Sequence, residues 1–104
     1  MEKPIYAVIF KAVIGDIDAT YHETASKLRR RAVELYGCIS FESYTQGDRE
    51  ITISYWQDEE QIVKWKNDQI HLKAQQMGRE KWYRSYQVQV VKLIKQYGED
   101  DQVG

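Results

Sequence analysis

The side chains best suited to chemistry lie in one stretch of the sequence, residues 50–97. It contains all three tryptophans of the chain, Trp56, Trp65 and Trp82, together with His71 and Arg79. His71 is the one side chain of this stretch whose ordinary pKa lies near neutrality, which makes it the best candidate for a general base. If the chain has a functional site, its polar groups are therefore expected to come from this stretch.

Other side chains of the stretch are suited to holding an aromatic molecule. Arg79 can pair with an anion, and Trp65 and Tyr55 can stack on a ring. Two more aromatic residues follow Arg79 in a basic segment, residues 78–84. We therefore predict two catalytic residues, His71 and Arg79, and four substrate-binding residues, Tyr55, Trp65, Trp82 and Tyr83.

Each candidate also has a structural alternative. A histidine between two helical pieces, like His71, is often a surface or capping residue. Trp65 shares a helical stripe with Ile62, which is typical of core packing. Arg79 can form ion pairs with Glu80 or with a partner chain. These alternatives stay open from the sequence alone.

The composition argues against several classes of protein. Fifteen basic and 16 acidic side chains leave a formal charge of −1, so no broad basic face for nucleic acid is expected. The basic run at residues 27–31 is interpreted as a solvated helix face. Cys38 is the only cysteine, and the two histidines lie far apart, so no metal site is predicted. No signal peptide and no apolar run of ~18 residues is present, so we expect a cytoplasmic protein without a membrane span.

The first half of the chain reads as a strand followed by a helix. Residues 5–14 are apolar at both odd and even positions, which indicates a strand covered on both faces. Residues 17–35 repeat apolar side chains at helical spacing, with Asp16 or Asp18 as the N-cap and Gly37 as a left-handed C-cap. In a domain of 104 residues, one layer of helices covers one sheet face. A second copy of the chain is then expected on the other face.

The second half reads as a hairpin, a broken helix and a last strand. Residues 38–45 and 50–56 alternate around a Gly47-Asp48 turn. A helix starts after Asp58, which with Gln61 resembles a capping box, and a break is expected near residues 67–69. A second helical piece covers residues 71–81, with Gly78 as a C-cap, and residues 84–96 form a strand. We expect one domain over residues 1–97 and a frayed acidic tail over residues 98–104.

This order predicts an α+β fold, the ferredoxin-like βαββαβ arrangement with a four-stranded antiparallel sheet and helices on one face. The order and the second-half pattern resemble the antibiotic biosynthesis monooxygenase (ABM) family of small dimeric α+β barrels. The residue-level match consists of Ser54-Tyr55-Trp56, Trp65, His71, the segment 78–83 and Tyr86. The resemblance at the level of the fold spans residues 5–97.

The resemblance implies a homodimer that joins through the open sheet face and binds a hydrophobic aromatic small molecule. Some members oxidise phenolic polyketides or quinols with O2 and no cofactor, and others degrade haem. Haem-degrading relatives combine a helix histidine and a tryptophan with an asparagine on the first strand, and residues 5–14 contain no asparagine. The resemblance therefore favours a cofactor-independent monooxygenase. The alternative is a non-catalytic module of the same fold that binds haem or another hydrophobic ligand.

Overall fold

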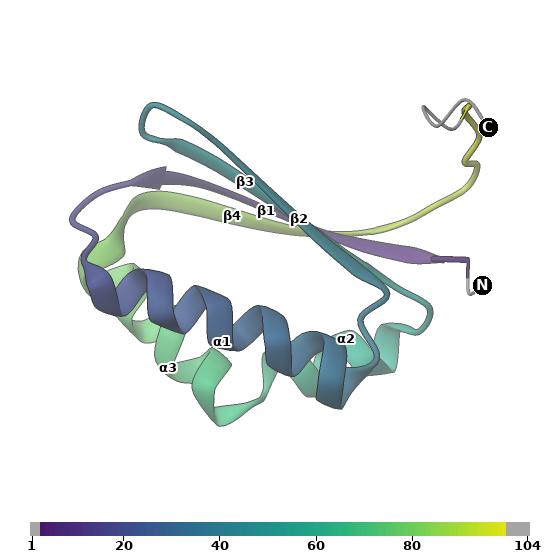
Figure 1. The fold of residues 1–104 in the computed structure, drawn as a ribbon, viewed down its shortest axis with the longest axis horizontal. Coiled ribbons are helices and arrows are strands. Elements are labelled where there is room, and N and C mark those ends of the chain that lie inside the picture. Colours follow the sequence, from purple (N-terminus) through teal and green to yellow (C-terminus); the bar gives the residue numbers. More distant parts are fainter. Residues whose placement is uncertain (1–2, 100–104) are drawn as a thin grey trace.

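The computed structural model describes residues 3–99 and contains one sheet with helices on one of its faces (Figure 1). In chain order the elements are β1 (Tyr6–Ile14), α1 (Ala19–Tyr36), β2 (Ser40–Gln46), β3 (Arg49–Trp56), α2 (Glu59–Lys66), α3 (Gln69–Met77), the π-helical turn η1 (Gly78–Trp82) and β4 (Tyr83–Lys92). The strands are antiparallel in the order β2-β3-β1-β4. This arrangement confirms the predicted ferredoxin-like fold.

The two faces of the sheet have different surroundings. On the helix face, Val8 of β1 and Trp56 of β3 pack with Ala32 of α1 and Ile62 of α2 in the core. Side chains alternate between the two faces along each strand, so the neighbours of these core residues point to the face without helices. The apolar side chains on that open face are Ala7, Ile9, Val13, Ile51, Ile53, Tyr55 and Val91. The predicted apolar character of both faces of β1 therefore corresponds to one helix-covered face and one open face (Figure 1).

The caps of α1 and the hairpin follow the sequence signals. Asp18 is the N-cap, and its carboxylate accepts a hydrogen bond of 3.1 Å from the Tyr21 backbone N–H. Gly37 ends the helix with a φ of 81°, a left-handed conformation that favours glycine. The β2–β3 hairpin turns at Gly47, whose φ is 60°. The strands of the hairpin begin and end within two residues of the predicted bounds.

The helical region between β3 and β4 differs from the prediction in its details. The break is present, but α3 already begins at Gln69, and Leu72 is 47% exposed, so the buried stripe ends with α2. Gly78 is the C-cap of α3, as predicted, but with a helical φ of −61°, and the chain continues from it into η1. Asp58 caps α2 through the Glu60 N–H at 2.7 Å, whereas the Gln61 side-chain oxygen finds no hydrogen-bond partner among the described residues, so the capping box is half formed.

The last strand is shorter than predicted at its end. β4 stops at Lys92, and the chain then leaves the sheet (Figure 1). Ile94, which falls inside the predicted strand 84–96, lies beyond β4 and is 97% exposed. Residues 98 and 99 have no regular structure, and the remainder of the predicted frayed tail, residues 100–104, lies outside the described residues. Within residues 3–99, none of the helices has the length and hydropathy to cross a bilayer.

Candidate functional site

Trp65 and His71 lie against each other where α2 and α3 meet. Trp65 is 7% exposed in the last turn of α2, and His71 is half-buried in the first turn of α3. Their ring centroids are 4.4 Å apart with an interplanar angle of 37°. Trp56 and Phe41 contact the other sides of the Trp65 indole at 5.2 and 6.0 Å between centroids. The break between the helices therefore brings together two of the predicted site residues.

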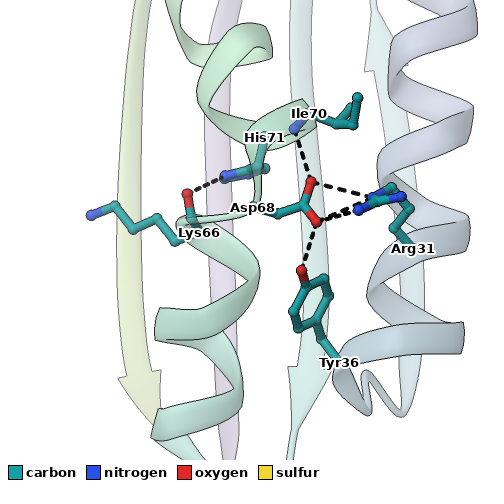
Figure 2. Close-up of polar contacts among 6 residues, drawn as sticks. All are labelled: Arg31, Tyr36, Lys66, Asp68, Ile70 and His71. Atoms are coloured by element: carbon teal, nitrogen blue, oxygen red, sulfur yellow. Dashed lines mark hydrogen bonds and ion pairs between the residues drawn. The ribbon is translucent and has the colours of Figure 1, made fainter.

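The surroundings of His71 determine which ring nitrogen carries the proton. His71 Nδ1 lies 3.2 Å from the Lys66 carbonyl oxygen (Figure 2). The Gln75 side-chain amide lies farther from the same nitrogen, at 3.4 Å. A carbonyl oxygen only accepts hydrogen bonds, so the shorter contact favours the proton on Nδ1, which leaves a lone pair on Nε2. Burial lowers the pKa of His71, which keeps the imidazole neutral at pH 7. A neutral imidazole with a free Nε2 is able to accept a proton, and the role of His71 as a base stays a prediction.

The indole of Trp65 carries an unused hydrogen-bond donor. Among the described residues, Trp65 Nε1 is buried without a hydrogen-bond partner, and so is Gln61 Oε1 one helical turn earlier. Trp56 differs in this respect, because its Nε1 donates to Ser54 Oγ at 2.8 Å. Buried polar atoms are nearly always paired in proteins, so an unpaired one at a candidate site calls for an explanation. A ligand acceptor that reaches the Trp65 N–H would supply the missing partner.

Asp68 fixes the corner between α2 and α3. Its carboxylate accepts hydrogen bonds from Arg31 Nη2 at 2.6 Å, the Tyr36 hydroxyl at 2.6 Å and the Ile70 backbone N–H at 2.8 Å (Figure 2). The Asp68 side chain is 3% exposed and that of Arg31 36% exposed. The Arg31 guanidinium, aided by Tyr36, holds the pKa of Asp68 well below its usual range. Asp68 therefore ties α1 to the start of α3.

A second group of aromatic rings, the Tyr21 cluster, lies around η1 and the start of β4. It consists of Phe10, Tyr21, Trp82, Tyr83 and Tyr86, with neighbouring ring centroids 5.2–6.0 Å apart. The Tyr21 hydroxyl donates to Glu50 at 2.6 Å, and burial together with this bond raises the pKa of Tyr21. Burial also raises the pKa of Tyr83 to about 12. Two predicted site residues, Trp82 and Tyr83, thus belong to a cluster other than that of Trp65 and His71.

The last two predicted site residues belong to neither ring group. Tyr55 follows Ser54 on β3 and points to the open face, where its hydroxyl donates to Glu42 at 3.1 Å. Arg79 is exposed on η1. The structure therefore brings together His71 and Trp65 in one place and Trp82 and Tyr83 in another.

Several basic residues form specific ion pairs. Lys81 pairs with Asp18 at 2.8 Å, and Arg84 pairs with Asp48. The interpretation of residues 27–31 as a solvated face is wrong for Arg31, because this member of the run reaches across to Asp68. The sequence signal that could have identified this pair is the aspartate at the helix break, a residue type that is typical of an N-cap.

Two surface depressions lie away from the Trp65–His71 pair. One of about 620 Å³ lies on α1, between Thr20 and Arg30. Another of about 610 Å³ lies at the hairpin end of the sheet and includes Lys11 and Tyr44. Neither is lined by Trp65 or His71. Residues 3–99 contain no group of three or more His, Cys, Asp or Glu side chains placed to hold a metal ion.

Known proteins are similar to this chain in sequence or in fold, although no family model matches it. A curated relative, the uncharacterized protein YqjZ of Bacillus subtilis, is 40% identical over 96 residues, which cover 91% of this chain and 84% of that protein. Among solved structures, SnoaB, a cofactor-independent oxygenase from Streptomyces nogalater, matches with a TM-score of 0.75 at 9% identity, over 93% of this chain and 100% of that one. A putative antibiotic biosynthesis monooxygenase from Nitrosomonas europaea matches with a TM-score of 0.72 at 11% identity, over 94% and 98% of the two chains.

Proposed function

Because the chain belongs to the same family as YqjZ of Bacillus subtilis and has the fold of antibiotic biosynthesis monooxygenases, we propose that it is a homodimeric, cofactor-independent monooxygenase. Its substrate is an aromatic small molecule of the phenol, anthrone or quinol class, which reacts with O2. The observation that carries the proposal is the contact between the Trp65 and His71 rings, whose centroids are 4.4 Å apart, together with the buried Trp65 N–H that has no partner among the described residues.

The two side chains have complementary roles in this reaction. His71 Nε2 takes a proton from the substrate, and the resulting anion is electron-rich enough to transfer an electron to O2. The Trp65 N–H donates a hydrogen bond to the anionic oxygen and so stabilises the charge that develops. For an anthrone, one CH2 group and O2 become one ketone group and water. A neutral imidazole suits the first step, because a protonated one has no lone pair to offer.

Access to Trp65 requires movement of α3. The indole N–H is enclosed in the structure, and none of the residues of α3 is buried. A helix that buries no residue of its own is held by few apolar contacts, so it opens at a low cost in free energy. In this proposal the part of α3 after His71 moves away to admit the substrate, while Asp68 keeps the first turn of the helix in place.

The open sheet face is the proposed dimer interface. It carries Ile9, Ile51 and Ile53 on adjacent strands, with the helices on the opposite side (Figure 1). A contiguous apolar face without a covering layer marks an interaction surface, and a second copy offers the same face in return. Tyr55 belongs to this face, so any contact it makes with substrate would come from within the dimer seam.

The remaining predicted site residues keep a proposed role near the Tyr21 cluster. Trp82 and Tyr83 would form an aromatic wall there, and Trp82 Nε1 is a second buried donor without a partner among the described residues. Arg79 lies exposed on the same turn, η1, as Trp82 and would attract an anionic substrate there.

The alternative function is a module that binds haem or another hydrophobic ligand without turnover. One observation favours it, because the unprotonated Nε2 of His71 is also the atom that ligates haem iron. The fit is incomplete. β1 contains no asparagine, and neither described depression lies at His71. The residues therefore suit a small phenolic ligand better than haem.

The test is O2 consumption by the purified, metal-stripped protein with a panel of anthrones and quinols. We expect uptake above the autoxidation of each substrate, lost in His71→Ala and reduced at least tenfold in Trp65→Phe. His22→Ala is the matched control, because His22 is an exposed histidine on α1. Uptake equal to the blank across the panel, together with tight haem binding that His71→Ala abolishes, would replace the oxygenase with the binding module.

A further inference from the structure

His71 Nδ1 contacts the Lys66 carbonyl oxygen at 3.2 Å and the Gln75 side-chain amide at 3.4 Å. The carbonyl contact is the shorter one, so the chemistry of the ring depends on the position of that carbonyl. The Lys66 oxygen ends α2, and His71 stands in the first turn of α3, with the corner Asn67–Asp68 between them. A shift of this corner would remove the 3.2 Å contact that keeps the proton on Nδ1. The free imidazole would then exchange between its two neutral forms.

The backbone of Asp68 belongs to both helices. Its N–H donates to the Trp65 carbonyl at 3.0 Å, and its carbonyl accepts from the Leu72 N–H at 2.9 Å. Its side chain caps α3 through the Ile70 N–H. The position of Asp68 therefore sets the position of the Lys66 carbonyl on one side and of the His71 ring on the other.

The side chain of Asp68 is anchored to α1 rather than to the imidazole. Figure 2 shows the carboxylate directed toward Arg31 and Tyr36, with His71 on the other side of the corner. Arg31 contributes two nitrogens to it, Nε at 3.2 Å and Nη2 at 2.6 Å. A two-pronged contact of this kind fixes orientation as well as distance. Arg31 thus pairs with the charge of Asp68. The carboxylate still raises the pKa of His71 through its charge, against the larger effect of burial, and its influence on the position of the ring runs through the backbone.

We propose that Asp68, held by Arg31 and Tyr36, is a positioning residue that keeps His71 in the Nδ1–H form with Nε2 free to accept a proton. This inference rests on the proposed role of His71 as the base. It assigns a role to three residues that do not touch the substrate themselves. It also explains why a buried aspartate occurs at the break between α2 and α3.

The test is a long-range 1H–15N correlation spectrum of the histidine side chains, which distinguishes the protonated ring nitrogen from the bare one. His22, exposed on α1, provides the internal reference. We expect the wild-type His71 to show the proton on Nδ1, and the ratio of Nδ1–H to Nε2–H to fall about tenfold in Asp68→Asn, the loss expected for one hydrogen bond. Glu60→Gln, which breaks an exposed ion pair with Lys64 on α2, should leave the ratio unchanged.

A folded Asp68→Asn protein with the wild-type ratio would overturn the inference. Should that variant not fold, Tyr36→Phe removes one hydroxyl from the carboxylate and carries the test, with a shifted ratio supporting the role and an unchanged ratio refuting it. The spectrum needs no turnover, so it is independent of the proposed oxygenase activity. Loss of the Nδ1–H form in the variant, together with absent O2 uptake in every protein, would uphold the positioning role and reject the oxygenase.

Discussion

Trp56 and Trp65 form a natural pair for separating a structural tryptophan from a functional one. Both are buried, at 0% and 7% exposure, and their ring centroids are 5.2 Å apart. They differ in the indole N–H, since Trp56 donates to Ser54 Oγ whereas Trp65 has no partner among the described residues. Replacing each by phenylalanine removes a similar amount of ring, which costs about 1 kcal/mol of the free energy of unfolding.

The variant Trp56→Phe carries an additional penalty. It leaves the hydroxyl of Ser54, a residue 2% exposed, without its donor, and an unpaired buried group costs about 1–3 kcal/mol. We therefore expect a loss of about 3 kcal/mol for Trp56→Phe and about 1 kcal/mol for Trp65→Phe. For a domain of this size, the difference of about 2 kcal/mol corresponds to about 8–16 °C in Tm.

Urea unfolding at one fixed protomer concentration measures both changes, because the stability of a dimer depends on concentration. The slope m should stay constant between the proteins, so that the midpoints report stability. O2 uptake per mole of folded protein should instead fall more in Trp65→Phe than in Trp56→Phe. If Trp65→Phe lowers the free energy of unfolding as much as Trp56→Phe does, the Trp65 N–H has a partner in solution and is not a free donor.

Three further predictions concern stability and reactivity. Arg31 lowers the pKa of Asp68, so the charged Asp68 carboxylate stabilises the fold above the unfolded pKa of about 4, and this stability is lost as the pH falls below that value. In a series of urea midpoints measured at falling pH, Asp68→Asn should therefore lose less stability in acid than the wild type, and an equal loss would contradict the prediction. Burial raises the pKa of Cys38 to about 11, so its thiol should react with a disulfide reagent at pH 8 at least tenfold more slowly in the native protein than in urea, and equal rates would show that the thiol is accessible. Gly78→Ala would bring Cβ within 2.7 Å of the Tyr83 ring and should cost about 1–2 kcal/mol in urea unfolding, whereas a stabilised variant would show that the ring moves freely.

The fold was predictable because its local signals agree with one another. Asp18 and Gly37 are favourable caps at the two ends of a long amphipathic pattern, and the Gly47-Asp48 pair suits a two-residue hairpin turn. Period-two apolar residues on both sides of β1 identify it as a central strand. These signals act between residues close in sequence, so a single sequence contains them.

The composition of the site was predictable only in part, because it depends on contacts between residues far apart in the sequence. Arg31 and Asp68 are 37 positions apart, and Arg31 reads as one of four basic residues on a helix face. Tyr55 and Trp56 are neighbours in sequence but point to opposite faces of β3, so a list of aromatic residues mixes two surfaces. The continuation of α3 into η1 places Trp82 and Tyr83 beside Tyr21 rather than beside Trp65.

The α2–α3 corner and the open sheet face lie on different sides of the sheet, so a proposed oxygenase site at the corner has to draw its groups from the corner itself. A phenolate needs a base, a donor for its oxygen and a wall for its ring, and the α2–α3 corner offers all three through His71, the Trp65 N–H and the Trp65 indole with its neighbour Phe41. None of these comes from the open face that the proposed dimer would bury. Substitutions on that face, such as Ile53→Lys, should therefore weaken association while leaving the His71 tautomer intact. Conversely, a change in the tautomer on dissociation would show that the partner subunit supports the corner.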